Sequence, residues 1–527
     1  MAPNLQSFTT DEVARHNTKD DAWILVDGKV FDITSFLDVH PGGRRILLPL
    51  LGKDASKQFA QYHNVTTVLG KYQTKLQIGS IQGSSVAQQA VKHFGPDSKD
   101  FGDLVAYGDP VWYQGWASPY YKASHKRLRA WARDLVETEL LPHIYEWDTE
   151  GKVPLSVYRK FGEVGFLSCI IGVFPWPEYV PHTPPVGIKP QEWDMFHELV
   201  VLDEMNRIGS VGVNQFLWVS PSIAVTPIIH FGSAEQKAKI IAPVLRGEKN
   251  IALGITEPYA GSDVANIQTT AVLSPDGKEF IINGEKKWIT TGNWADYFVV
   301  AARTGGKGMG GISLLLVDRS TPGFTTRPVA CQGCRGSGTA YLMFEDCRVP
   351  TSNLIGKMNQ GFSYIMKNFN HERLSGCVGA IRLARCCYED AMLYAHKRRT
   401  FGKVLFEHAV IRNKLAHMVR QIEATQAWLE FIIYQFSHMT AEEALYKMGG
   451  PTALLKAQCS QVLEYCAREA SQVLGGVAYT KGGVGERVER IYRDVRGVAI
   501  PGGSEEIMLD LGIRQAQKVS QGMGAKL

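Results

Sequence analysis

The sequence has few features of a secreted or membrane-spanning protein. Its 527 residues include only nine cysteines, an odd number that favours reduced thiols inside a cell over a disulfide framework. The longest apolar stretch, Ile46–Leu51, is far shorter than the roughly 18 residues that a membrane span needs. The N-terminus lacks the apolar segment of a secretory signal, and Asp11 and Glu12 precede its first arginine, Arg15, which argues against a mitochondrial transit peptide.

A strong charge of either sign is also missing. The 57 Lys and Arg residues against 52 Asp and Glu residues leave a net charge of +5, which is too dilute to indicate nucleic acid binding. An apolar fraction of 45% and a charged fraction of 21% are typical of globular proteins and exclude wholesale disorder. At roughly 150 residues per domain, the length indicates about three to four domains.

The last residues, 521–527, form a short tail that ends in Ala525-Lys526-Leu527. This tripeptide closely resembles the Ser-Lys-Leu address for peroxisomal import, which a receptor reads and which does not anchor a protein to a membrane. We therefore expect a peroxisomal protein, or a cytoplasmic one if the match is accidental.

Residues 1–82 have the pattern of a small α+β domain, and residues 83–105 have that of a linker. A helix start of the Thr-x-x-Glu type stands at Thr9–Glu12. Two short strands are expected on either side of a turn at Asp27-Gly28: Trp23–Val26 and Lys29–Ile33. The Gly, Ser and Pro residues after this domain predict the linker.

The remaining sequence divides into a helical, a β-rich and a second helical segment. Residues 106–250 are mostly helical. Residues 251–360 are rich in strand-forming residues, and Asn283-Gly284 predicts a hairpin turn between two of the strands. Residues 361–520 regain helical periodicity, with one apolar stripe made of Leu415, Met418, Val419, Ile422, Leu429, Ile432, Ile433 and Phe436.

Two histidines of the first domain could bind haem. His40 stands in a His-Pro-Gly-Gly loop, and His63 follows it 23 residues later. Two neutral imidazoles can fill both axial positions of a haem iron, and glycines let the backbone approach the flat macrocycle. Iron ligated in this way cannot bind oxygen and carries electrons. The alternative is that each histidine is an ordinary surface or core residue.

The whole of residues 1–82 resembles the cytochrome b5 family. The resemblance rests on Phe8–Val13, Trp23, Gly28–Asp32 and His40–Gly43. It implies that the domain holds haem b, with His40 and His63 as the iron ligands. Arg44 and Arg45 stand where this family often has acidic residues, and no anchor helix follows. Both departures fit a haem domain whose redox partner is tethered in the same chain.

Residues 106–520 resemble the acyl-CoA dehydrogenase family in the order and spacing of several segments. These are Ile251–Ala265, Trp288–Thr290, Arg398–Lys403 and Gln472–Gly476. The resemblance implies a multidomain fold in which an α domain, a middle β-barrel domain and a C-terminal four-helix bundle follow the cytochrome b5-like module. It also implies FAD bound at a subunit interface, within a homodimer or homotetramer.

The same resemblance implies which residues hold the cofactor. Thr256, Trp288 and Thr290 would contact the isoalloxazine ring, with Thr290 near N5. Residues of the neighbouring subunit would hold the adenine-diphosphate half: Arg398, Phe401, Gln472, Gly475 and Gly476. Two further residues complete the cofactor set, Gly502 and Ser504. The residues that would bind the substrate are Ser262, which also lies near the flavin phosphates, Arg373 and Gly502. Taken singly, each signal is weak, and Trp288 could be a core residue.

Two other motifs are interpreted as decoys. Gly306–Gly311 satisfies the G-x-G-x-x-G pattern of dinucleotide sites, but a strand rather than a helix is expected after it, which predicts a hairpin loop. Cys331 and Cys334 form a single Cys-x-x-Cys pair with no second pair at zinc spacing, so we expect no metal there.

The general base is the least conventional part of the expected site. Removing a proton α to a thioester needs a carboxylate of raised pKa in a dry pocket beside the flavin. Most of the family supplies this glutamate from a C-terminal segment, where this chain has Gly502. Isovaleryl- and long-chain-type members supply it from a helix instead, and Glu372 stands at that position, directly before Arg373. The alternatives are a surface role for Glu372 and a base at Glu505 or Glu506.

The expected activity is FAD-dependent dehydrogenation of acyl-CoA thioesters to trans-2-enoyl-CoA. Glu372 would take the α-proton, the β-hydrogen would leave as hydride to flavin N5, and the electrons would pass singly to the haem. The N–H of Gly502 and a ribityl hydroxyl would polarise the thioester carbonyl. Three alternatives stay open: an oxidase that makes peroxide, a flavin monooxygenase fed by the haem domain, and a non-catalytic sensor. The final acceptor stays open between oxygen and a reductase or cytochrome.

Overall fold

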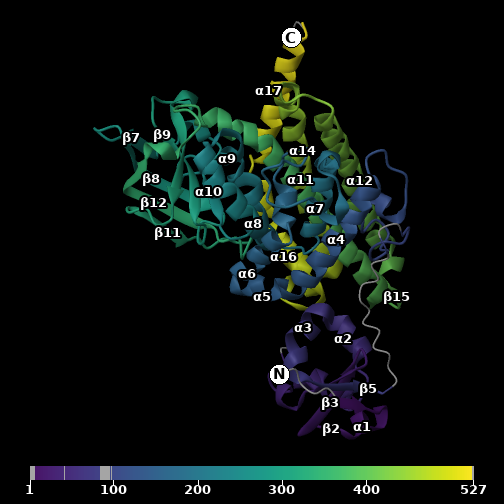
Figure 1. Ribbon diagram of the computed structural model, residues 1–527. Helices are drawn as coiled ribbons and strands as arrows, with labels where there is room; N and C mark the ends of the chain where they lie inside the picture. The colour runs from purple at the N-terminus through teal and green to yellow at the C-terminus, as the bar shows by residue number, and fades with distance from the viewer. Residues whose placement is uncertain (1–5, 41, 64, 83–94, 96–97, 525–527) are drawn as a thin grey trace.

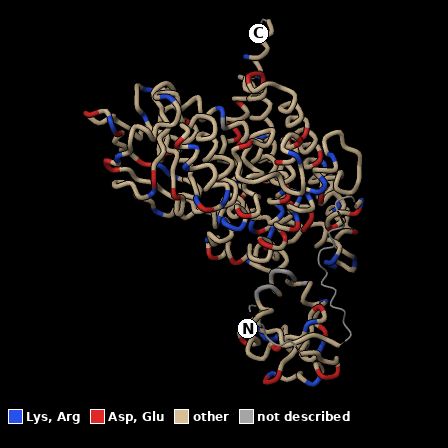
Figure 2. The backbone as a smooth tube through the Cα atoms, in the orientation of Figure 1, with Lys and Arg blue, Asp and Glu red and all other residues tan. Residues whose placement is uncertain are grey.

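A computed structural model describes residues 6–40, 42–63, 65–82, 95 and 98–524 (Figure 1). The small N-terminal domain lies at one end of a larger body, and the β domain projects from one side of that body. Residues of both charge signs are spread along the backbone of both parts (Figure 2). The predicted import signal, 525–527, and most of the predicted linker lie outside the described residues. Among the helices described, none is long and apolar enough to cross a membrane.

The N-terminal domain is a five-stranded sheet covered by short helices. Its strand order is β1-β5-β4-β3-β2. The strands are β1 (Gln6–Phe8), β2 (Asn17–Thr18), β3 (Asp21–Val26), β4 (Lys29–Asp32) and β5 (Gln77–Ile81), and the helices are α1 (Thr10–Arg15), α2 (Ser56–Tyr62) and α3 (Val65–Leu76).

Two local predictions for this domain are confirmed. Thr9 caps α1, because its hydroxyl accepts the N–H of Glu12 and the Glu12 carboxylate accepts the N–H of Thr9. The turn between β3 and β4 has positive φ at both Asp27 and Gly28, which matches the right-handed twist of a tight hairpin.

The first helical part of the large body contains seven α-helices. They are α4 (Ala123–Glu139), α5 (Ile144–Glu150), α6 (Leu155–Glu163), α7 (Met195–Asn206), α8 (Val211–Trp218), α9 (Thr226–Phe231) and α10 (Ala234–Leu245). The packed body begins inside the predicted linker range, because Phe101 is fully buried under the guanidinium of Arg129.

A buried ion network fixes this part to the C-terminal helices. Asp109 accepts hydrogen bonds from Arg133 of α4 at 2.7 Å, from Arg207 at the end of α7 at 3.2 Å, and from Arg382 at 2.9 Å. Removing one member of such a network leaves an uncompensated buried charge, which typically costs about 3–5 kcal/mol. The network therefore holds α7 at a fixed position next to the C-terminal bundle.

The middle domain is an eight-stranded sheet. Its strands are β6 (Ile251–Gly254), β7 (Thr270–Leu273), β8 (Glu279–Ile289), β9 (Tyr297–Arg303), β10 (Ile312–Asp318), β11 (Phe324–Pro328), β12 (Ala340–Pro350) and β13 (Leu354–Ile355). The order is β11-β12-β8-β7-β9-β10-β13, with β6 paired to β9. The Gly306–Gly311 motif joins antiparallel strands β9 and β10, so the prediction of a hairpin loop is confirmed.

The hairpin turn predicted at Asn283-Gly284 is wrong. Both residues lie inside β8, and the turn before that strand contains Gly277 instead. Gly284 has φ +137°, and a Cβ placed on it would lie 2.7 Å from the Cα of Thr269. Gly284 therefore lets the backbone at Thr269 approach closely within the sheet. Asn and Gly, which often form a turn, here continue a strand.

The C-terminal part is a helical bundle. It consists of α11 (Gly361–Lys397), α12 (Ala409–Ser437), α13 (Ala441–Lys447), α14 (Gly449–Leu474), α15 (Gly476–Tyr479), α16 (Glu486–Ala499) and α17 (Glu505–Gly522), with a hairpin of β14 (Arg399–Thr400) and β15 (Lys403–Val404) after α11. The predicted apolar stripe lies on α12 and faces the core. Helix α17 continues two residues into the predicted tail.

Candidate active site and cofactor sites

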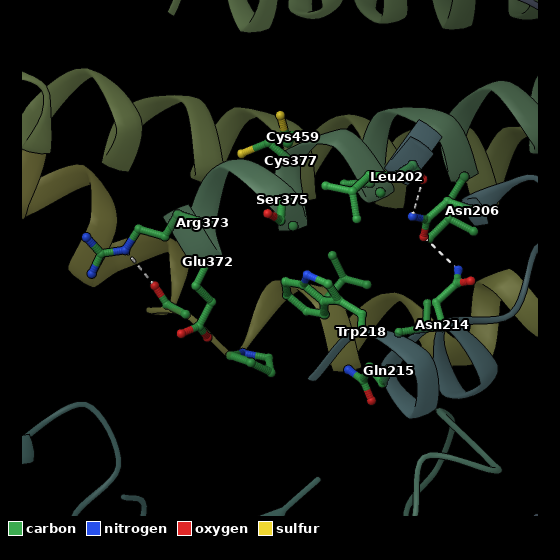
Figure 3. A pocket seen from close by; sticks show the side chains of 18 of the residues that line it. Leu202, Asn206, Asn214, Gln215, Trp218, Glu372, Arg373, Ser375, Cys377 and Cys459 are labelled. Carbon is green, nitrogen blue, oxygen red and sulfur yellow. Dashed lines mark hydrogen bonds between the residues drawn. The ribbon is translucent and has the colours of Figure 1, made fainter. Parts of the chain in front are cut away.

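A cavity that is partly open to solvent lies between the first helical part and the C-terminal bundle. Its walls come from α7, α8, α11, α14 and the end of α16, and residues of the loop between α16 and α17 complete the lining (Figure 3). The cavity brings together three residues that the sequence assigned to catalysis or substrate binding: Glu372, Arg373 and Gly502.

Glu372 and Gly502 reach the same place from two elements. Glu372 lies on α11, and its Oε2 is buried without a hydrogen-bond partner among the described residues. A Cβ built on Gly502 would lie 3.9 Å from Oε1 of Glu372. A glutamate at either position could therefore direct a carboxylate into the same part of the cavity, as the relocated-base prediction requires.

Burial raises the pKa of Glu372 to about 7, against the opposing charges of Arg373, His371 and Lys456. A carboxyl group with this pKa is about half ionised at neutral pH, where it can take a proton and later release it. The rival residues differ from it, since Glu506 is exposed and the Glu505 carboxylate hydrogen-bonds to Ser460 at 3.2 Å and Gln461 at 3.3 Å.

Two cations hold the loop that carries Gly502. The buried Nζ of Lys456 donates to the carbonyl oxygens of Ala499 at 2.5 Å and Gly503 at 2.6 Å. Nε of Arg373 donates to the carbonyl of Gly502 at 3.0 Å. The N–H of Gly502 has no partner among the described residues, so it can donate to a carbonyl bound in the cavity. Sequence reasoning missed Lys456 because a lone lysine in a helix has no motif that marks it.

The residues predicted to contact the flavin ring lie together on the middle domain. Thr256 follows β6, and its carbonyl accepts the N–H of Lys287 at 2.9 Å, which places it beside Trp288 and Thr290 at the end of β8. Trp288 is half exposed and has φ +60°, an unusual backbone conformation that often marks ligand sites. Ser262 lies exposed in the loop after β6.

A buried ion pair supports this segment from below. Lys286 donates to the Glu257 carboxylate at 2.7 Å and to the carbonyl of Ile255 at 3.0 Å. Glu257 also accepts the N–H groups of Gln268 and Thr269. Since these bonds fix the residues on both sides of Thr256, an open face of threonine and tryptophan side chains stands on a rigid base, which fits a flat aromatic cofactor.

The residues predicted to hold the adenine-diphosphate half lie elsewhere. Arg398 and Phe401 are exposed at the β14–β15 hairpin, which Figure 1 shows on the opposite side of the body from β8. Gln472, Gly475 and Gly476 are exposed around the end of α14, and a Cβ on either glycine would meet no atom within 4 Å. Within one chain, the residues predicted to contact the flavin ring and those predicted to hold the adenine-diphosphate half therefore lie apart. That the second set binds the FAD of a neighbouring subunit stays a prediction. Ser504, two residues after Gly502, stands at the N-cap position of α17 without a side-chain capping hydrogen bond.

His40 and His63 face each other in the N-terminal domain with ring centroids 6.0 Å apart. A metal held by two imidazoles at about 2 Å from each nitrogen needs about this separation. Nδ1 of His40 contacts the carbonyl of Gly43 at 3.3 Å, and Nδ1 of His63 contacts that of Phe59 at 3.1 Å. Protons at both Nδ1 atoms leave both Nε2 atoms for the iron. Burial lowers the pKa of His63, which favours the neutral form that binds metal.

A second histidine cluster, which sequence reasoning did not notice, has a structural explanation. His125, Asp194 and His197 place three ligand-type atoms within 4.8 Å of one another. Nδ1 of His125 accepts the N–H of Lys122 at 2.8 Å, so its Nε2 carries the proton that is donated to Asp194 at 3.1 Å. That nitrogen has no lone pair for a metal, and the cluster caps α4 and α7 instead.

Comparison with known protein families agrees with this division of the chain. Models of the acyl-CoA dehydrogenase N-terminal, middle and C-terminal domains match residues 122–248, 252–347 and 359–517. The chain belongs to the acyl-CoA dehydrogenase family. Residues 9–82 match the cytochrome b5-like heme/steroid binding domain. The protein is therefore an oxidoreductase of this family fused to a cytochrome b5-like domain.

Individual relatives support the assignment. The acyl-CoA dehydrogenase apdG of Emericella nidulans is 41% identical over 427 residues, which are 80% of this chain and 98% of the relative. The butyryl-CoA dehydrogenase of Megasphaera elsdenii has a TM-score of 0.68 at 27% identity, over 76% of this chain and all of its own. An acyl-CoA dehydrogenase of Bacillus anthracis complexed with FAD has a TM-score of 0.68 at 26% identity, over 78% of this chain and 69% of its own. FAD and haem are the cofactors that these families indicate.

Proposed function

We propose that the protein oxidises acyl-CoA thioesters between the α and β carbons, with Glu372 as the base, and passes the electrons to its own haem. The observation that carries this proposal is the buried carboxyl group of Glu372, which faces Gly502 across one end of the cavity. A carboxyl group with a pKa of about 7 in this position is suited to take the α-proton of a thioester.

The chain's own residues then have separate tasks. Glu372 holds the α-proton after transfer. Lys456 and Arg373 fix the loop so that the N–H of Gly502 donates to the thioester carbonyl, which stabilises the negative charge that develops there. FAD, when bound, would supply the acceptor for the β-hydrogen and its two electrons, which leave together as hydride. The substrate thus loses one proton and one hydride and becomes a trans-2-enoyl thioester.

The position of the N-terminal domain supports transfer to the haem. Figure 1 shows α2 and α3, the helices next to His63, facing the dehydrogenase body. The carbonyl of Tyr62, at the end of α2, would lie 2.8 Å from a Cβ at Gly483, so the two backbones meet closely there. Tethering gives the haem a high effective concentration beside the dehydrogenase. Haem bound there would supply a one-electron acceptor, so an external acceptor would be needed to remove the two electrons of each turnover.

Anaerobic mixing of the holoenzyme with a chain-length series of acyl-CoA thioesters tests this proposal. We expect loss of flavin absorbance followed by the spectrum of reduced haem. Flavin reduction without haem reduction, with peroxide formed once air is admitted, would indicate an oxidase. No flavin reduction with any thioester would indicate a monooxygenase fed by the haem or a sensor. Glu372→Gln is the control for proton abstraction, and His63→Ala is the control for the haem signal.

A further inference from the structure

Two buried polar atoms in the wall of the cavity lack partners among the described residues. They are Oγ of Ser375 on α11 and Nε1 of Trp218, the last residue of α8. Ser375 is only 5% exposed, and the Trp218 nitrogen is shielded although its ring is partly accessible. Figure 3 shows the indole nitrogen on the edge of the ring that faces Ser375. A donor and a hydroxyl group therefore border the same part of the cavity.

This polar pair lies beyond the catalytic base along the cavity. Ser375 follows Glu372 by three residues, so the two side chains share one face of α11 about 4.5 Å apart along the helix axis. In Figure 3, Arg373, Glu372 and Ser375 follow one another from the loop end of the cavity towards its far end. A substrate whose α-carbon lies at Glu372 would thus place a carbon a few positions beyond its β-carbon between Ser375 and Trp218.

The far end of the cavity is polar as well. The amide nitrogen of Asn206 donates to the carbonyl of Leu202 at 2.8 Å, which fixes the orientation of that amide. The oxygen of Asn206 then accepts from the nitrogen of Asn214 at 2.7 Å. The Asn214 oxygen is left without a partner among the described residues. Both asparagines are buried and line the cavity beside apolar side chains such as Leu202 and Leu383, so a hydrocarbon chain that reached this end would meet an unpaired amide oxygen.

A plain alkyl chain fits the apolar walls of this cavity but leaves its polar atoms unpaired. It would exclude water from the Ser375 hydroxyl and the Trp218 N–H without replacing the lost hydrogen bonds, and each unpaired group lowers affinity by about tenfold. Sites built to hydrogen-bond a substrate reject the analogue that lacks the group more strongly than apolar pockets discriminate by size. The arrangement thus favours a chain that carries its own polar atom at this depth.

We propose that the natural substrate is an acyl-CoA thioester whose chain carries an oxygen substituent, bound between Trp218 and Ser375. A hydroxyl oxygen would accept the indole N–H and donate to Oγ of Ser375, and a keto oxygen would accept from both groups. This inference rests on the proposed dehydrogenation, since it names the substrate class of the same cavity.

The test compares acyl-CoA thioesters of equal length that carry a hydroxyl group, a keto group or no oxygen, with the substituent moved one carbon at a time. The measurement is kcat/KM for flavin reduction by the holoenzyme. For one position of the oxygen we expect a preference of about tenfold or more over the unsubstituted thioester, and the hydroxy and keto series show which group fits. Equal use of all thioesters would mean that water satisfies the polar atoms, and would overturn the inference.

Variants connect the preference to the two residues. In Trp218→Phe with Ser375→Ala, the ratio of kcat/KM for oxygenated over unsubstituted thioesters should fall to about one. Cys377→Ala, which removes one atom from the same wall of α11, should leave this ratio unchanged. FAD content and thermal unfolding establish that each variant is folded. If the double variant keeps the full preference, these residues do not bind the oxygen. If no thioester of any kind reduces the flavin, the dehydrogenation itself is refuted.

Discussion

Replacing Glu372 with glutamine should slow the chemistry while making the fold more stable. Glutamine keeps the shape of the side chain but cannot take a proton. General-base catalysis typically contributes about 10²–10⁴-fold, so flavin reduction by acyl-CoA should slow at least about a hundredfold, with FAD and substrate still bound. Stopped-flow absorbance under anaerobic conditions measures this rate directly.

The gain in stability follows from the pKa. The pKa of Glu372 is about 7 in the folded chain, against 4.5 for an unperturbed glutamate side chain. A carboxyl group whose pKa rises on folding destabilises the fold progressively as the pH increases from about 4.5 to about 7, and the penalty is constant above that. At about 1.4 kcal/mol per pH unit, the penalty at pH 8 is about 3 kcal/mol. Glu372→Gln avoids it, so its denaturant midpoint should exceed that of the wild type at pH 8 and differ little at about pH 4.

The pH dependence of the wild-type rate has the same origin. Because only ionised Glu372 accepts a proton, kcat/KM for flavin reduction should rise about tenfold per pH unit below pH 7 and level off above it. The combination Glu372→Gly with Gly502→Glu should restore part of the activity. Gly502 has φ +69°, so a glutamate there is strained by about 1–2 kcal/mol, and full recovery is not expected. Near wild-type flavin reduction by Glu372→Gln, with no gain in stability at pH 8, would show that Glu372 is not the base and leave Glu505 or Glu506 as the candidates.

Three further predictions concern the haem, the catalytic loop and the address. His40→Ala and His63→Ala should each lose the low-spin haem absorbance spectrum while keeping FAD. A normal haem spectrum in both variants would show that these histidines are not the iron ligands. Lys456→Met should lower kcat about tenfold or more and weaken the red shift in the absorbance of a chromophoric thioester bound to the enzyme. Lys456→Arg keeps the positive charge and should retain more of this red shift. An unchanged red shift in both variants would show that the loop does not need this cation. A fluorescent reporter ending in residues 518–527 should enter peroxisomes. A diffuse signal in the cytosol would show that the resemblance of the last three residues to the import address is accidental.

The parts of the molecule that sequence predicted well are those set by local rules. The capping box at Thr9 and the Asp27-Gly28 turn depend on residues close in sequence, and both formed as expected. Asn283-Gly284 has the same local signal but lies within a strand, where Gly284 packs closely against Thr269. A rule for turns considers only neighbouring residues and so does not include this contact. Local patterns thus decide a turn only where no neighbouring strand approaches.

In the candidate site, too, sequence predicts some residues, and others are found only from the packing of the helices. The position of Glu372 could be predicted because it stands beside Arg373 in a recognisable segment. Lys456, Trp218 and Ser375 could not, because their roles arise only when α8, α11 and α14 pack around one cavity. The two polar atoms of the proposed substrate subsite come from residues 157 positions apart in the chain, with no motif in common.

The rate of haem reduction after anaerobic mixing with acyl-CoA, measured at several protein concentrations, shows whether the fused haem is the electron acceptor. If the fused domain accepts the electrons inside one molecule or one oligomer, haem reduction follows flavin reduction with a first-order rate constant that does not change with protein concentration. A rate constant that rises in proportion to protein concentration, or a haem that stays oxidised while the flavin is reduced, would show that electrons do not pass from the flavin to the haem of the same molecule or oligomer.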